Sequence, residues 1–193
     1  MLGAAAVAAM VTVSACGNSG SSQAVSATPA VTTSTSVAAD AHNQADMMFA
    51  HHMIPHHQQA IEMSDMLLDK QGIDPRVVDL AQQIKAAQGP EIETMKGWLT
   101  QWGMSGSMPA MNGMNGMDGM MSSADMDALH NAQGVAAAKL YLTQMITHHQ
   151  GAIKMAQSEI TDGQNAAAVA LARSIVTDQQ REIDTMNQIL ATL

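Results

Sequence analysis

The chain has 193 residues, enough for one domain with a substantial core once a leader is removed. Only 2% of the residues are aromatic and 19 are methionines, so the core must be built from Ala, Ile, Leu and Met, of which Ala and Met favour helices. The formal net charge of −9, with no basic cluster, argues against nucleic-acid binding, which depends on neutralising phosphates with Lys and Arg.

Residues 1–15 carry no charge and are mostly Ala, Val and Met, and this stretch is too short to span a membrane. We interpret it as a lipoprotein signal peptide. The small residues before Cys16 resemble a bacterial lipobox, so we predict that Cys16 is lipidated and becomes the mature N-terminus. The alternative is an ordinary signal peptide with an incidental cysteine. No Lys or Arg precedes the apolar run, which leaves the true translation start open.

Residues 16–39 are uncharged and rich in Ser, Thr and Ala. They show neither helical nor strand periodicity, so we predict a flexible tether that holds the following domain off a membrane. Cys16 is the only cysteine of the chain, which rules out an internal disulfide.

Four helices are predicted in the following domain, residues 40–193. Gly72 ends the first helix, because glycine readily adopts the left-handed conformation found after a helix C-terminus. Asp74 and Pro75 restart the chain as an N-cap and a first helical residue. Gly163 separates the last two helices. The predicted helices cover about residues 41–70, 75–102, 123–160 and 164–192.

Residues 103–122 combine Met with Gly, Asn, Pro and Ser, which forbid a stable helix. One long connection between two short-linked helical hairpins is the pattern of a ferritin-like four-helix bundle, and we predict this all-α fold. Exposed methionines in the loop bury nothing, so core filling does not explain them. Their soft thioethers could wrap Cu(I) or Ag(I), and the alternative is low-complexity drift. Four of them recur every three residues: Met111, Met114, Met117 and Met120.

The two predicted hairpins resemble each other in sequence. Residues 53–63 read MIPHHQQAIEM and residues 145–155 read MITHHQGAIKM, so eight of eleven positions are identical at an offset of 92. Further identities recur at an offset of 91 between the second and fourth helices, including Gln88 with Gln179 and Glu91 with Glu182. The chain is therefore predicted to be a duplicated two-helix unit.

A helical wheel places both histidines of each motif on an inward face. The inward residues of the two motifs are Met53, His56, His57 and Met63 in the first helix and Met145, His148, His149 and Met155 in the third. The other two helices carry a predicted buried polar layer within apolar stripes: Gln88, Glu91, Gln179 and Glu182. Burying an ionised carboxylate unpaired costs several kcal/mol, so each Glu is expected to lie buried against an inward histidine.

This layer has two interpretations that the residues leave open. One is a structural network in which Glu holds His, Gln fills the remaining hydrogen bonds, and the layer fixes the helix register. The other is a metal site, because imidazole suits Cu, Zn, Fe and Ni and thioether selects Cu(I). The two can coexist, since a ligating imidazole normally donates its other N–H to a carboxylate.

The motif MIPHHQ at residues 53–58, with Ala60, Ile61 and Met63, resembles the signature of the bacterial domain-of-unknown-function 305 family. The likeness covers roughly residues 42–193 and both motif copies. It implies a ferritin-like fold, an extracytoplasmic location and a role in copper binding or copper resistance, without saying which residues hold copper. The chain departs from the pattern at Thr147, where the first copy has Pro55, and in its Met-dense crossover.

We therefore expect a lipid-anchored extracytoplasmic protein that buffers or sequesters copper, preferring Cu(I) and also taking Cu(II), and that needs no metal to fold. Homo-oligomerisation is left open. One alternative is a metal-free helical interaction module. Another is a di-iron oxidase on the same fold, which would need Glu-x-x-His motifs that the sequence lacks. No nucleophile elbow, phosphate loop or acid–base dyad supports catalysis.

Overall fold

A computed structural model describes residues 41–104 and 118–193. The predicted all-α class is confirmed for these residues, which form no strand, and none of their helices is both long and apolar enough to cross a membrane. The signal peptide, Cys16, the tether, Met111, Met114 and Met117 lie outside the described residues, whereas Met120 is described and half-buried. The five helices are α1 (Gln44–Leu68), α2 (Pro75–Gln101), α3 (Ser123–Asn131), α4 (Gly134–Asp162) and α5 (Ala166–Leu190).

Three of the long helices begin at residues whose side chains satisfy free backbone N–H groups. Asn43 starts α1 with a capping box that it shares with Asp46. Asp74 caps α2 directly before Pro75, whose missing N–H needs no partner at the first helical position. Asn165 caps α5. The caps of α2 and α5 mark where each hairpin turn ends and its second helix begins.

The helix predicted over residues 123–160 is divided in the structure. α3 ends at Asn131, the next two residues are extended, and α4 starts at Gly134. The φ angle of Gly134 is 53°, a left-handed conformation that glycine adopts at little cost. The prediction of one continuous helix was wrong. An isolated glycine within a helical pattern is often tolerated, so Gly134 alone did not indicate a break in the helix. The short α3 is anchored by Leu129, which is fully buried.

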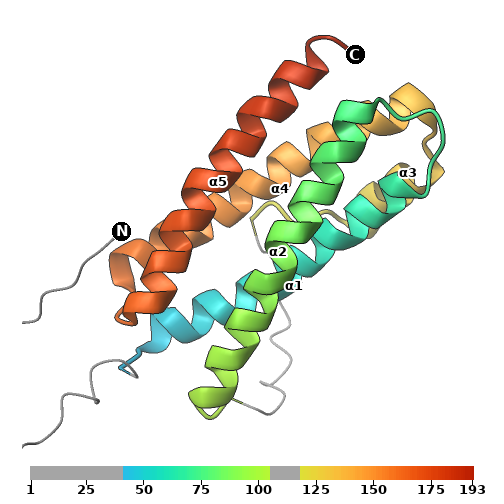
Figure 1. Cartoon of the computed structure of the whole chain (residues 1–193). Helices are drawn as coiled ribbons and strands as arrows, with labels where there is room; N and C mark the ends of the chain where they lie inside the picture. The colour runs from blue at the N-terminus through green and yellow to red at the C-terminus, as the bar shows by residue number, and fades with distance from the viewer. Residues whose placement is uncertain (1–40, 105–117) are drawn as a thin grey trace, which may run out of the picture. The chain divides into compact units, whose positions relative to one another are not determined.

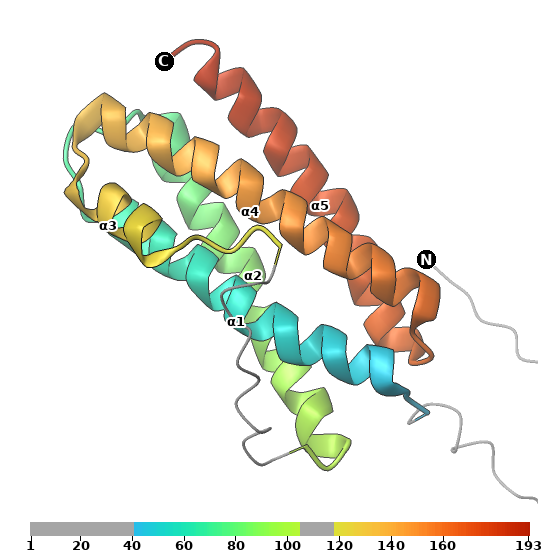
Figure 2. The ribbon, with the colours of Figure 1, turned by 180° about the vertical axis from the view of Figure 1, so that it is seen from behind.

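The four long helices form two hairpins (Figure 1). α1 packs along α2, α4 packs along α5, and α1 also packs against α4. α2 and α5 make few contacts with each other. On the side opposite to α2 and α5, the segment that leads into α3 crosses the face formed by α1 and α4 (Figure 2). A chain segment therefore covers the α1–α4 side, whereas α2 and α5 are only loosely packed on the other side.

Polar residues divide the apolar core into two clusters. The larger cluster lies toward the α1–α2 turn and includes Met63, Leu67, Ile84, Met145 and Met186. The smaller cluster lies toward the α4–α5 turn and includes Phe49, Met53, Met95, Ala152 and Ile175. Between these clusters, every long helix contributes two polar residues to what we call the central layer. Its members are His56, His57, Gln88, Glu91, His148, His149, Gln179 and Glu182.

Candidate metal centre

Two histidine–glutamate pairs occupy equivalent places in the two hairpins. His57 Nε2 lies 2.7 Å from Glu91 Oε2, and His149 Nε2 lies 2.7 Å from Glu182 Oε2. Both imidazoles are fully buried. Because an ionised carboxylate can only accept, each Nε2 carries the hydrogen that is donated. The repeated sequence thus produces the expected Glu–His contact in both hairpins.

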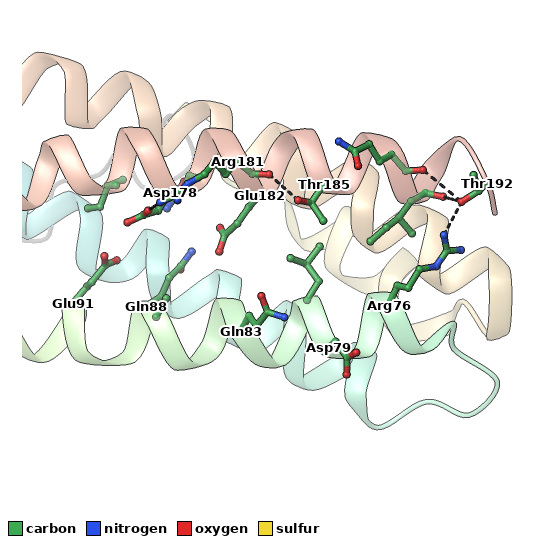
Figure 3. Close-up of a pocket in the computed structure, with 16 residues that line it drawn as sticks. Arg76, Asp79, Gln83, Gln88, Glu91, Asp178, Arg181, Glu182, Thr185 and Thr192 are labelled. Carbon is green, nitrogen blue, oxygen red and sulfur yellow. Dashed lines mark hydrogen bonds and ion pairs between the residues drawn. The ribbon is translucent and has the colours of Figure 1, made fainter.

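The two glutamates are not fully buried, contrary to the expectation from the helical wheel. Each carboxylate side chain is 20% exposed. Both line a groove of about 890 Å³ between α2 and α5, and Figure 3 shows Glu91 and Glu182 directed into this space. Gln88 and Gln179, which are buried, line the same groove, and both amide atoms of Gln88 lack a partner among the described residues. The loose packing of α2 against α5 explains the exposure.

The other two histidines meet where α1 packs against α4. The ring centroids of His56 and His148 are 3.8 Å apart, and the rings are tilted by 43°. Burial lowers the pKa of His56 to about 3, and the charge of His57 acts in the same direction. Burial also holds the pKa of His148 well below its ordinary value, with the charge of His56 adding to the effect. Both imidazoles are therefore neutral at pH 7, the state that binds metal ions.

The central layer leaves several ring nitrogens without a hydrogen-bond partner. Nδ1 of all four histidines has no partner among the described residues, and His148 also lacks one at Nε2. His56 Nε2 lies 3.2 Å from the backbone oxygen of Asp118. Buried polar atoms are normally satisfied, so this concentration of unsatisfied atoms needs an explanation. A neutral imidazole always presents one nitrogen with a free lone pair, and a metal ion accepts that lone pair.

The methionines of the two motif copies lie in or against the two apolar clusters that border the central layer. Each motif copy places one methionine in the larger cluster and one in or against the smaller cluster. Three of the four are fully buried and the last is half-buried: Met53, Met63, Met145 and Met155.

The four histidines do not converge on one point. In residues 41–104 and 118–193, no group of three or more His, Cys, Asp or Glu side chains is arranged to hold a metal ion. A metal centre at the His56–His148 pair would have two imidazole donors, and the thioether sulfurs of the neighbouring clusters are candidate further ligands. That donor set fits a soft ion such as Cu(I) and does not fit a hard ion such as Mg²⁺ or Ca²⁺.

A second buried polar feature was not predicted from the sequence. Asp46 and Glu159 lie together, and we call this pair the end cluster. Burial raises the pKa of Glu159 to about 8, and the adjacent Asp46 carboxylate contributes, so Glu159 is mostly protonated at pH 7. Burial alone would raise the pKa of Asp46, but hydrogen bonds lower it instead. Its backbone donors are the N–H groups of Asn43, Gln164 and Asn165.

The chain matches the family described as a domain of unknown function (DUF305) over residues 46–190. Similar solved structures include a DUF305 protein from Streptomyces coelicolor that is inferred to be secreted. It is 37% identical, with a TM-score of 0.70, over 80% of this chain and 94% of that one. A DUF305 fragment from Deinococcus radiodurans is 30% identical, with a TM-score of 0.71, over 78% of this chain and 98% of the fragment.

A third similar structure is CopM in a Cu(I)-bound form. It is 33% identical, with a TM-score of 0.65, over 76% of this chain and 96% of CopM. CopM has also been solved with Cu(II), with silver and without metal. No curated protein matches the chain. The family match over most of the chain confirms the resemblance seen in the His-His-Gln motif, and the chain belongs to the DUF305 family.

Proposed function

We propose that this protein binds copper at the central layer and so buffers or sequesters the metal outside the cytoplasm. The ligands are the ring nitrogens of His56 and His148, completed by thioether sulfur from the methionines of the two motif copies. One observation carries the proposal: a buried pair of neutral imidazoles has unpartnered nitrogens and lies in a layer bordered by the clusters that hold the motif methionines. His57 and His149 support the layer through their carboxylate partners.

Cu(I) is preferred over Cu(II) for two physical reasons. Thioether sulfur is a soft ligand that selects Cu(I). Burying a monovalent ion between two neutral rings also costs less desolvation free energy than burying a divalent ion there. The similarity to CopM, which has been crystallised with Cu(I), Cu(II) and silver, supports copper as the metal. The protein binds and holds the ion, performs no chemistry on it, and folds without it.

The location rests on the N-terminal sequence. Residues 1–15 direct export, lipidated Cys16 anchors the mature chain, and residues 16–39 hold the domain away from the membrane. The inferred secretion of the Streptomyces coelicolor relative supports an extracytoplasmic location. Release of the intact protein from membranes by Cys16→Ser would support the anchor, whereas equal membrane retention of both proteins would contradict it.

The architecture that we propose is a ferritin-like four-helix bundle made of two duplicated hairpins, with α3 as an addition within the crossover connection. The matched His–Glu pairs, each at 2.7 Å with equal exposure, support the duplication. A metal-free interaction module would need the layer to be satisfied by its own hydrogen bonds, and the unpartnered imidazoles count against that alternative.

Anaerobic Cu(I) titration against a competing chromophoric chelator tests the proposed site. The double substitution His56→Leu with His148→Leu removes both nitrogen donors while keeping side chains of similar size. We expect this variant to lose one equivalent of bound Cu(I) relative to wild type. His130→Leu is the control, because His130 is exposed on α3, and it should bind as wild type does. Equal stoichiometry and affinity in the double variant would overturn the proposed site.

A further inference from the structure

A short segment at the end of the methionine-rich crossover is fastened beside the His56–His148 pair. We call residues Asp118–Met121 the clamp segment. At one end, Gln59 Nε2 donates to the Met121 backbone oxygen at 2.9 Å, and the Met121 N–H donates to Gln59 Oε1 at 2.7 Å. At the other end, Lys154 Nζ lies 3.2 Å from Asp118 Oδ2. α1 and α4 therefore each hold one end of the segment, which crosses them in Figure 2.

Between these ends, the clamp segment lies too close to α4 for a side chain to intervene. A Cβ atom added to Gly151 would lie 1.9 Å from the backbone oxygen of Asp118. A Cβ atom added to Gly119 would lie 2.7 Å from the backbone oxygen of Thr147. Space thus requires glycine at both positions. This close approach places the Asp118 carbonyl 3.2 Å from His56 Nε2.

The positions at which the two motif copies differ are largely those that hold the clamp segment. Residues 53–63 and 145–155 differ at three places. One is Gln59 in the first copy and Gly151 in the second, and another is Glu62 and Lys154. Gln59, Gly151 and Lys154 all contact the clamp segment. The differences between the copies therefore serve to seat this segment on one side of the central layer.

We infer that the clamp segment is a positioning element that fixes the tautomer of His56, an inference that rests on the copper site proposed above. A backbone carbonyl only accepts hydrogen bonds, so neutral His56 carries its hydrogen on Nε2 and donates it to Asp118. Nδ1 of His56 then holds the lone pair and is the atom that binds the metal. The clamp segment makes no hydrogen bond to His148, whose pKa is lowered mainly by burial and is also influenced by the backbone of His56.

Gly151→Ala tests the inference against Gly97→Ala as a matched control. Both glycines lie within helices, but a Cβ atom at Gly97 meets nothing within 4 Å, whereas one at Gly151 must displace the Asp118 carbonyl. Long-range ¹H–¹⁵N NMR spectra of the metal-free proteins at pH 7 report the tautomer of each histidine. We expect the Nε2–H tautomer of His56 in wild type and in Gly97→Ala, and a mixture of both tautomers in Gly151→Ala.

Gln59→Ala is a second variant that adds no bulk, and it keeps the inference testable if Gly151→Ala does not fold. It removes both hydrogen bonds to Met121 and should also yield mixed tautomers. Cu(I) affinity of the same proteins should fall about tenfold in both variants, the usual effect of losing a partner that orients a ligand, at unchanged stoichiometry. Wild-type His56 with its hydrogen on Nδ1 would overturn the inference even if copper binds. Wild-type protein that binds no Cu(I) at the layer would overturn the proposed function while the tautomer result stands.

Discussion

The two buried polar clusters differ in whether a proton can complete their hydrogen bonding. In the end cluster, three backbone N–H groups donate to Asp46. The raised pKa of Glu159 gives it a proton to donate to the same carboxylate, which leaves its other carboxyl oxygen without a partner among the described residues. In the central layer, burial lowers the pKa of His56 and His148. A proton on either ring would create a buried cation, so protonation does not satisfy these nitrogens.

The comparison separates a structural polar cluster from a functional one. Both are buried, and burial alone predicts neither role. A carboxyl group beside a carboxylate gains a proton, whereas an imidazole beside an imidazole loses one. In the first cluster, a proton shared between the two carboxyl groups supplies a hydrogen bond without a ligand. The second leaves lone pairs unpartnered, which a soft metal ion completes in the function proposed above.

The largest expected effect is a change in the free energy of unfolding with pH, and we attribute it to Glu159 in the end cluster. The folded-state pKa of Glu159 is about 8, above the ordinary value of 4.5, so the folded state binds this proton more tightly than the unfolded state. Its contribution is complete below about pH 4.5 and is lost as pH rises toward 8. We expect a loss of about 3–5 kcal/mol in the free energy of unfolding.

Urea unfolding of wild type and Glu159→Gln between pH 5 and pH 9 measures this loss. Glutamine keeps a donor for Asp46 and does not titrate, so the variant should lack this part of the pH dependence and exceed wild type in stability at pH 9. Glu93→Gln alters an exposed carboxylate and serves as the control. Parallel stability profiles for wild type and Glu159→Gln would show that the end cluster does not share a proton.

The next largest expected effect is the loss of stability when either glutamate of the central layer is removed, and it compares the two hairpins with each other. Glu91→Ala and Glu182→Ala each remove the partner of a fully buried histidine and should cost about 2–3 kcal/mol of unfolding free energy. Because the two pairs have the same geometry, their costs should agree within about 0.5 kcal/mol. Glu62→Ala, on the outer face of α1, should cost less than about 0.5 kcal/mol. Unequal costs for Glu91→Ala and Glu182→Ala would mean that the two hairpins are not energetically equivalent.

The smallest expected effect is a near absence of pH dependence in copper binding. An imidazole with the ordinary pKa of about 6.5 would lose about 30-fold in metal affinity between pH 7 and pH 5. The pKa of His56 is about 3, so Cu(I) affinity of the central layer should change less than about twofold over this range. Competition titrations at pH 7, 6 and 5 measure it. A 30-fold loss would show that the histidines are solvated and that the layer is open to water.

Helical periodicity was enough to predict which side chains face inward. The helical spacing of His57 in α1 and of Glu91 in α2 placed both side chains on inward stripes. Because a buried carboxylate needs a partner, this spacing was enough to predict the contact between His57 and Glu91. Periodicity could not predict how tightly α2 packs against α5. The partial exposure of Glu91 and Glu182 depends on that packing distance, which no single helix encodes.

Sequence patterns did not predict the parts of the site that depend on loops and turns and not on helical periodicity. The partner of His56 is a backbone oxygen of Asp118, and any residue type offers that atom. Asp46 reads as a capping residue of α1, and nothing local shows that the α4–α5 turn and Glu159 close over it. A comparison of the two motif copies position by position, with Gln59 against Gly151, was the sequence signal that could have located the clamp segment.

X-ray absorption spectroscopy at the copper edge tests most directly whether the central layer holds the metal. The protein should carry Met111→Leu, Met114→Leu, Met117→Leu and Met120→Leu, so that the crossover cannot supply ligands, and one equivalent of Cu(I). We predict that this variant still binds the ion and that the spectrum contains imidazole nitrogen together with sulfur. Adding His56→Leu and His148→Leu should remove the nitrogen signal. Loss of Cu(I) binding in the loop variant, or a spectrum with sulfur alone, would contradict copper binding at the central layer.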